Sequence, residues 1–309
     1  MISFARLLLR RVILLVTLLA CVFVAVDLLP GSTAHAVLGR EAAPEQIAAK
    51  ERELGLDRPL AVRFWQWISG VATGDFGRTA RGRPVNDLLV EKFPPTLLLG
   101  GLALAVTVLA SLALGAWWAT RPGSVAARVL QPTTTTAVAV PEFVIATVLI
   151  LVFALALGWL PAVTITGRSG MPAGPEMLVL PVFALALPQI GWNTRVVRAA
   201  LSDAALAPHV ESAVLDGLSS RTVLVRHVLP FALPTIVASF ATTVGMLLGG
   251  ALVVETVFNY PGLGAVLAGS VADRDTSVVA AVVALSGVVI MVVLAVADGI
   301  RTWSLRGRR

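Results

Sequence analysis

The chain has 309 residues, of which 57% are hydrophobic and only 14% are charged. Soluble domains carry about 25% charged residues, so this composition excludes a chain whose whole surface faces water. The net charge of +6 comes from basic residues that flank apolar runs rather than cluster with aromatic ones, which argues against a nucleic-acid partner.

Six apolar segments approach or exceed the roughly 20 residues that a helix needs to cross a bilayer core. They lie at 12–29, 97–119, 134–157, 178–192, 232–254 and 277–297. The third is interrupted only by Pro141-Glu142, and the short fourth contains Pro181 and Pro188. The pattern predicts an all-α integral membrane protein, with residues 1–309 forming a single domain of six transmembrane helices.

The arginines orient these spans. With both termini in the cytoplasm, the two short outer loops contain only Arg168 and Arg274. The cytoplasmic side then holds thirteen of the 24 basic residues: Arg6, Arg10, Arg11, Arg121, Arg128, Arg195, Arg198, Arg221, Arg226, Arg301, Arg306, Arg308 and Arg309. The other nine lie in the long outer segment, where charge does not determine orientation.

The N-terminus has an alternative interpretation. The arginines, the apolar run and Ala34-His35-Ala36 also resemble a signal peptide with a cleavage site, which would leave five spans. The apolar run exceeds the usual 7–15 residues of a signal peptide, which favours an uncleaved first span.

The segment 30–95 is the outer loop. It is predicted to form helices at 44–54, which Pro44 begins, and at 60–68, with Trp65 and Trp67 as interfacial anchors. Residues 74–77 read as a turn. The segment is too small for an enzyme domain, so we expect an outer cap or docking surface.

The stretch 193–230 is a long, polar, cytoplasmic loop between the fourth and fifth spans. A short helix is expected to end at Gly217, which supplies its C-cap, and a second to begin at Ser219 as N-cap. Pro230 is expected to mark the entry to the fifth span. Such a helix–Gly–helix loop is suited to transmit rigid-body motion from a soluble partner.

This stretch resembles a loop shared by permease subunits of bacterial ABC importers. The sequence pattern of that loop is E-A-A, three residues, Gly, nine residues, an apolar position, one residue and then Leu-Pro. The matching residues are Glu211, Ser212 (in place of the middle alanine), Ala213, Gly217, Leu229 and Pro230. Landmarks along nearly the whole chain are similar to the dipeptide/oligopeptide subfamily: Leu29-Pro30-Gly31, Leu54-Gly55-Leu56-Asp57, Gly74-Asp75-Phe76-Gly77, Gly158-Trp159-Leu160-Pro161 and Asn259-Tyr260-Pro261-Gly262.

The resemblance implies the ABC importer type I permease fold and a binding-protein-dependent, multi-pass protein of the bacterial cytoplasmic membrane. It implies that the 193–230 loop docks on ATPase subunits. Partners implied are two ABC ATPase subunits, a second, related permease subunit, an extracytoplasmic solute-binding protein and membrane lipid. Substrates in the subfamily are mostly di- and oligopeptides, with nickel complexes and some sugars. The chain itself would be a transporter subunit without catalytic residues.

No cofactor or metal is expected. Cys21 is the single cysteine, and the three histidines lack metal-ligand spacing. Neither lysine, Lys50 or Lys92, lies in a P-loop motif, so ATP must be handled by another chain.

Three residues point to the translocation pathway. A charge as deep as Glu142 costs at least about 2.5 kcal/mol, so it should face the bundle interior or a wet cavity. It either contacts a cationic part of the substrate, or serves interhelical hydrogen bonding or stays hydrated near the interface. Pro181 and Pro188 free backbone carbonyls, which transporters tolerate next to a cavity or a neighbouring helix.

Two other function classes fit the sequence less well. Gly167-Arg168-Ser169-Gly170 matches a pattern of the rhomboid intramembrane proteases, but every histidine lies outside the spans, and the serine needs one in reach. An ion-gradient-driven secondary transporter would favour internal repeats and deep ionisable residues, and here Glu142 is the only deep carboxylate.

Overall fold

The computed structural model describes residues 2–29, 31–39 and 41–306. The landmark proline Pro30 and the orienting Arg308 and Arg309 therefore lie outside the described residues. The described part is helical and contains two isolated β-bridges but no strand. It divides into two compact units, one of Met1–Thr96, Arg168–Met171 and Pro261–Met291 and the other of Leu97–Gly167, Pro172–Tyr260 and Val292–Arg309.

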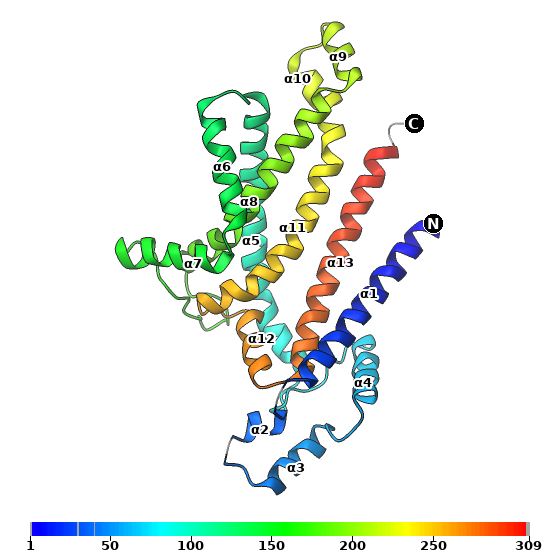
Figure 1. Ribbon diagram of the computed structural model, residues 1–309, viewed down its shortest axis with the longest axis vertical. Coiled ribbons are helices and arrows are strands. Elements are labelled where there is room, and N and C mark those ends of the chain that lie inside the picture. The colour runs from blue at the N-terminus through cyan, green and yellow to red at the C-terminus, as the bar shows by residue number, and fades with distance from the viewer. Residues whose placement is uncertain (1, 30, 40, 307–309) are drawn as a thin grey trace. The chain divides into compact units, whose positions relative to one another are not determined.

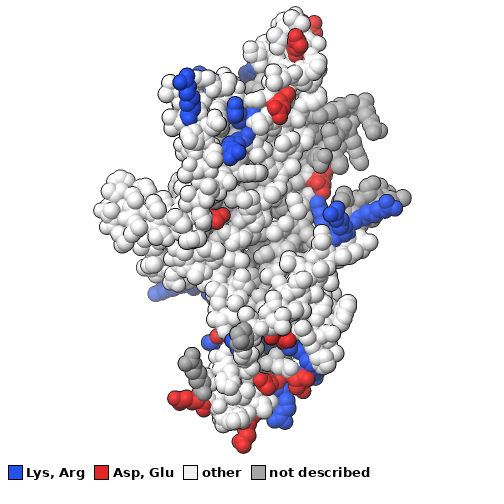
Figure 2. All heavy atoms as spheres, viewed as in Figure 1, with Lys and Arg blue, Asp and Glu red and all other residues white. Residues whose placement is uncertain are grey.

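The first unit holds most of the charged outer segment. Its helices are α1 (Ile2–Asp27), α2 (Thr33–Leu38), α3 (Pro44–Glu53), α4 (Leu60–Ala72), the start of α5 (Val85–Thr120), α12 (Leu263–Ala272) and the first half of α13 (Thr276–Arg306). The helices expected at 44–54 and 60–68 are confirmed, as α3 and α4. In the expected turn 74–77, Gly74 and Gly77 both have a positive φ. Figure 2 shows basic and acidic side chains crowded over the region of α2 and α3.

Aromatic rings join α1 to α4. The Phe23 ring lies 5.3 Å from the Phe64 ring and 5.2 Å from the Trp67 ring, measured between centroids. An ion pair of 2.9 Å joins Arg63 of α4 to Asp27 at the end of α1. The end of the first apolar segment is therefore tied to the outer segment by both packing and charge.

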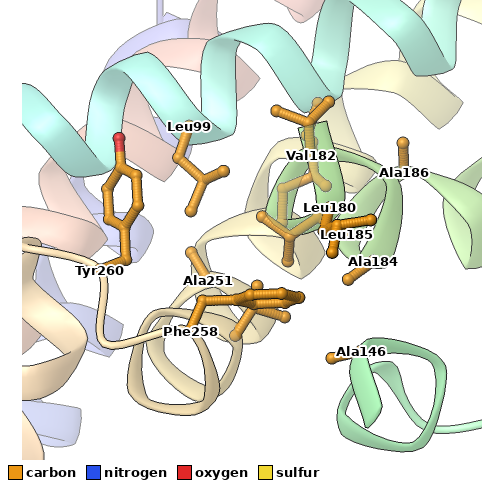
Figure 3. Packing of buried hydrophobic residues seen from close by; sticks show 13 residues of the cluster. Leu99, Ala146, Leu180, Val182, Ala184, Leu185, Ala186, Ala251, Phe258 and Tyr260 are labelled. Carbon is orange, nitrogen blue, oxygen red and sulfur yellow. The ribbon is translucent and has the colours of Figure 1, made fainter. Parts of the chain in front are cut away.

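The second unit is built around α8 (Glu176–Ala205), which packs against α6 (Val125–Ala139), α7 (Glu142–Leu149) and α11 (Leu229–Val257). The other elements are the rest of α5, the π-helices η1 (Ile150–Ala156) and η2 (Leu224–Val228), α9 (Pro208–Leu215), α10 (Ser220–Val223) and the second half of α13. Figure 3 shows the apolar core of this unit, in which Leu99, Leu185, Phe258 and Tyr260 are almost completely buried.

The third expected span, 134–157, is not one straight helix. The chain turns by 107° between Val125–Ala139 and Glu142–Ala156. The cause is local: a residue before proline is disfavoured in the helical region, and Val140, which precedes Pro141, is extended at φ −87° and ψ 123°. The expected interruption at Pro141-Glu142 is therefore a sharp bend between two helices.

The fourth and fifth expected spans are parts of longer helices. The segment 178–192 lies within α8, which continues to Ala205, so the first third of the expected loop 193–230 is helical. The helix of the fifth segment runs from Ser220 to Val257. It passes Pro230 without a break. The π-helix η2 ends at Val228, and Pro230, which has no N–H to donate, is the second residue of α11.

By length and composition, the described residues contain five helices suited to cross a membrane, or six if the bent pair counts as one span. They include Leu9–Asp27, Val85–Thr120, Glu176–Ala205, Ser220–Val257 and Thr276–Ile300. The orientation of these helices stays a prediction.

Candidate functional site: the elbow between α8 and α11

The expected loop contracts to a compact elbow, residues 206–219, which connects α8 to the helix that begins at Ser220. In Figure 1, α9 and α10 lie at the end of α8 and α11 that is furthest from α7. Ala207 is the N-cap of α9, and Pro208 occupies its first position, where the missing N–H costs nothing.

Gly217 ends α9 as the sequence predicts. Its φ of +75° lies in the left-handed region, which glycine adopts without steric cost. The Gly217 N–H donates to the Val214 carbonyl at 3.0 Å, and the Leu218 N–H donates to the Ala213 carbonyl at 3.2 Å. These two bonds form a Schellman motif, which satisfies carbonyls at the end of the helix.

Ser219 begins the next helix, also as predicted. Its hydroxyl accepts from the Thr222 N–H at 3.3 Å and lies 2.8 Å from the Thr222 hydroxyl. Because one residue separates the glycine C-cap from the serine N-cap, the direction change between the two helices is set locally.

One side of the elbow is buried against the unit's own helices. Val210 and Ala213 of α9 pack in a cluster with Val223, Val197 and Leu201. The Nε2 atom of His209 is 3.0 Å from the His227 carbonyl oxygen, and the His209 ring lies 4.1 Å from the Phe231 ring. The elbow is therefore held as a rigid extension of α8 and α11 rather than as a loose loop.

The other side of the elbow is exposed and apolar. Leu206 and Leu215 are 85% and 80% exposed, and Val214 is 58% exposed. Glu211 is exposed about one helical turn before Val214 and Leu215 on α9. Large apolar side chains left exposed in this way are typical of a site that another protein covers.

The structure separates the predicted loop residues by location. Glu211 and Ser212 are exposed on α9, where the Ser212 hydroxyl donates to the Pro208 carbonyl at 3.1 Å. Ala213 faces the core at 3% exposure. Leu229 and Pro230 lie at the start of α11, beyond the elbow, where Leu229 is 39% exposed.

Of the three predicted pathway residues, Glu142 lies on α7, and Pro181 and Pro188 lie on α8. Glu142 is the first residue of α7, directly after the bend, and is partly buried. A methyl group added at Gly250 of α11 would lie 3.4 Å from the Glu142 carboxylate. A carboxylate at a helix N-terminus is stabilised by the helix dipole. Pro181 and Pro188 are both buried within α8.

Sequence reasoning missed a polar cluster between α8 and α11. Asn193, which is completely buried, donates through Nδ2 to the Gln189 carbonyl and to the Thr243 hydroxyl, both at 2.8 Å. The Ser239 hydroxyl donates to Asn193 Oδ1 at 2.7 Å. The only sequence signal is an asparagine directly after the fourth apolar segment. Its partners on α11, Ser239 and Thr243, lie 46 and 50 residues further along the chain.

Comparison with protein families gives two matches. The family described as "Binding-protein-dependent transport system inner membrane component" matches residues 111–309, and "Binding-prot-dependent transport system membrane comp, N-term" matches residues 1–100. Together they cover nearly the whole chain, including both units and the elbow.

Curated relatives align over nearly their full length. The chain is 34% identical over 281 residues to the glutathione transport system permease protein GsiC of Salmonella choleraesuis, covering 90% of this chain and 89% of the relative. It is 31% identical over 295 residues to the probable peptide ABC transporter permease protein y4tP of Sinorhizobium fredii, covering 93% and 94%.

Solved structures share the fold at lower identity. An amino acid ABC transporter with histidines has a TM-score of 0.51 and 18% identity, covering 67% of this chain and 89% of that chain. An inward-facing form of the MetNI methionine ABC transporter has a TM-score of 0.50 and 17% identity, covering 70% and 94%.

Proposed function

Because the chain belongs to the family of binding-protein-dependent transport system inner membrane components, we propose that the elbow couples its pore to ATP hydrolysis on a partner. The chain is a multi-pass permease subunit of an ATP-driven importer in the inner membrane, and it is not itself an enzyme. The ATPase is on a partner subunit, and substrate binding involves a further partner.

The exposed apolar surface of the elbow carries the coupling proposal. Leu206, Val214 and Leu215 present apolar area on a part of the chain that is rigidly packed on its other side. A groove on the ATPase would cover these side chains, and Glu211 would contact it from the same helix. Motion of the groove would then move α8 and α11 together, because both helices continue directly from the elbow.

The remaining assembly is proposed as follows. Both termini and the elbow lie on the cytoplasmic side, and the segment 30–95 faces outward toward a solute-binding protein. Two ATPases bind the membrane part, in which this chain pairs with a second, related permease. Membrane lipid surrounds the helices.

The substrate class is proposed from the relatives. GsiC is named for glutathione, itself a small peptide, and y4tP for peptides. We take di- or oligopeptides as the cargo. Glu142, beside the bend that Pro141 causes, is proposed to line the pathway, and Pro181 and Pro188 to shape α8 next to it.

The coupling proposal is tested by purifying the tagged full chain, expressed from its native locus, in a mild detergent. We expect a P-loop ATPase and a second permease to co-purify. Leu215→Glu places a charge at the exposed apolar surface without touching the core, so it should remove the ATPase. Leu38→Glu, at a leucine of the segment 30–95 that is 42% exposed, should not. Equal ATPase recovery with both variants would refute coupling through the elbow.

A further inference from the structure

The first unit contains a cavity of about 340 Å³ that shares no residue with the elbow. It is bounded by the end of α1, by α3 and α4, and by the segments around residues 78–80 and 274–277. All of these segments belong to the same compact unit. Its volume is within the range of small-molecule sites, about 300–1,000 Å³.

Five arginines line this cavity: Arg52, Arg58, Arg63, Arg78 and Arg274. Of these five arginines, only Arg63 has a carboxylate partner within 4 Å among the described residues, namely Asp27. Arg58 donates to the Gln66 side-chain oxygen at 3.2 Å, and Arg78 donates to the Gly82 carbonyl at 3.1 Å. Neutral oxygens leave the positive charge of these guanidinium groups uncompensated.

Two carboxylates also line the cavity, fewer than the five arginines. Glu53 forms an ion pair of 2.7 Å with Lys50. Asp275 accepts hydrogen bonds from the backbone N–H groups of Ala80 at 2.6 Å and Val278 at 3.3 Å. Five arginines against two carboxylates give the cavity lining a net positive charge, whereas the segment 30–95 carries nine basic and eight acidic residues in all.

The backbone places Arg274 in the cavity by two unusual features. Arg274 has a φ of +56°, a left-handed conformation that costs a non-glycine residue free energy and that clusters at functional sites. The Thr33 hydroxyl donates to the Arg274 carbonyl at 3.0 Å. A methyl group added at Gly31 would overlap the Arg274 guanidinium, so only glycine leaves room for this side chain there.

The other walls are apolar and aromatic. Phe23 and Trp67 line the cavity together with Leu54 and Leu56. The Trp67 indole N–H donates to the Phe76 carbonyl at 3.1 Å, which fixes the ring. A small molecule with an apolar body and an acidic end would match both kinds of wall, because guanidinium groups bind carboxylates through paired hydrogen bonds.

We propose that this cavity binds the terminal carboxylate of a small peptide on the outer side of the membrane. The inference rests on the proposed function for the side and for the cargo class. A small anion fits better than an acidic protein surface, because the exposed Glu53 lines the cavity and the exposed Asp57 lies in the chain between its lining residues Leu56 and Arg58, and both would repel such a surface.

The test uses the full chain in nanodiscs of phosphatidylcholine, with labelled Ala-Phe and its C-terminal amide as probes in equilibrium dialysis. We expect the free acid to bind at least about tenfold tighter than the amide, since charge-assisted hydrogen bonds distinguish them. The double variant Arg58→Gln with Arg78→Gln should remove this difference. Arg81→Gln should not, because Arg81 pairs with Asp273 in the same unit and does not line the cavity.

A second variant guards against misfolding of the arginine variants. Gly31→Ala keeps every arginine but displaces the Arg274 guanidinium, so it should reduce the preference for the acid while the thermal unfolding transition persists. Equal binding of acid and amide by the wild type would overturn the proposal. So would competition by phosphatidylglycerol in the nanodisc that abolishes dipeptide binding, since the site would then hold a lipid phosphate. Neither result would affect recovery of the ATPase, which tests the proposed function separately.

Discussion

Replacing Gly217 by alanine should loosen the elbow through backbone strain alone. The φ of +75° costs an alanine about 1–2 kcal/mol, because its Cβ meets the following carbonyl oxygen. No atom lies within 4 Å of the position a Cβ would take, so no clash adds to this cost. The equilibrium constant between the folded elbow, with its Schellman hydrogen bonds formed, and the locally unfolded elbow should therefore shift by about 5- to 30-fold toward the unfolded form.

Amide hydrogen exchange measures this shift directly. The N–H groups of Gly217 and Leu218, which form the Schellman bonds, should exchange about 5- to 30-fold faster in Gly217→Ala. Gly217→Asn should show a smaller increase, because asparagine tolerates the left-handed region. Gly82→Ala is the matched control: it has a φ of +88° and open space, but lies in the other unit. Unchanged protection of the elbow in Gly217→Ala would refute the strain argument.

Three further predictions concern single buried or partly buried polar residues. Glu142→Gln should weaken uptake of a peptide with a cationic group relative to a neutral one, measured by competition in cells; unaltered selectivity would contradict a pathway role. Asn193→Leu should lower stability by about 1–2 kcal/mol in thermal unfolding in detergent, because the Thr243 hydroxyl loses its buried partner; an unchanged transition would contradict this. Asp275→Asn should cost about 1–3 kcal/mol, since an amide cannot accept from both backbone donors. Burial raises the pKa of Asp275, so the folded chain binds this proton more tightly than the unfolded chain. The wild type should therefore gain stability relative to Asp275→Asn as the pH falls through the raised pKa toward the ordinary value of 3.8, and an equal pH response of the two would contradict the assignment.

Local chemistry made part of the site predictable. Gly217 and Ser219 each determine the backbone within one helical turn, so the end of α9 and the start of α10 follow from the sequence. Pro141 restricts only its neighbour, so the sequence located the interruption but not the 107° turn, which depends on packing in the second unit.

Other features depend on contacts between distant residues or on a different property of the chain. Apolar composition indicates only the part of a helix that can contact lipid. The predicted fourth span therefore ended at residue 192, although α8 continues to Ala205. The partners of Asn193 lie on α11, and the arginine-lined cavity brings Arg58 together with Arg274. No spacing rule in the sequence connects such pairs.

The central claim, that the chain is the permease of an ATP-driven importer, is tested most directly by the energy source of uptake. Cells lacking the chain and cells complemented with it are given labelled glutathione or a labelled dipeptide. Chain-dependent uptake should persist when an uncoupler collapses the proton gradient while ATP is maintained, and should stop when ATP is depleted while the gradient is maintained. Uptake that stops when the proton gradient collapses but persists when ATP is depleted would contradict this assignment and identify a secondary transporter.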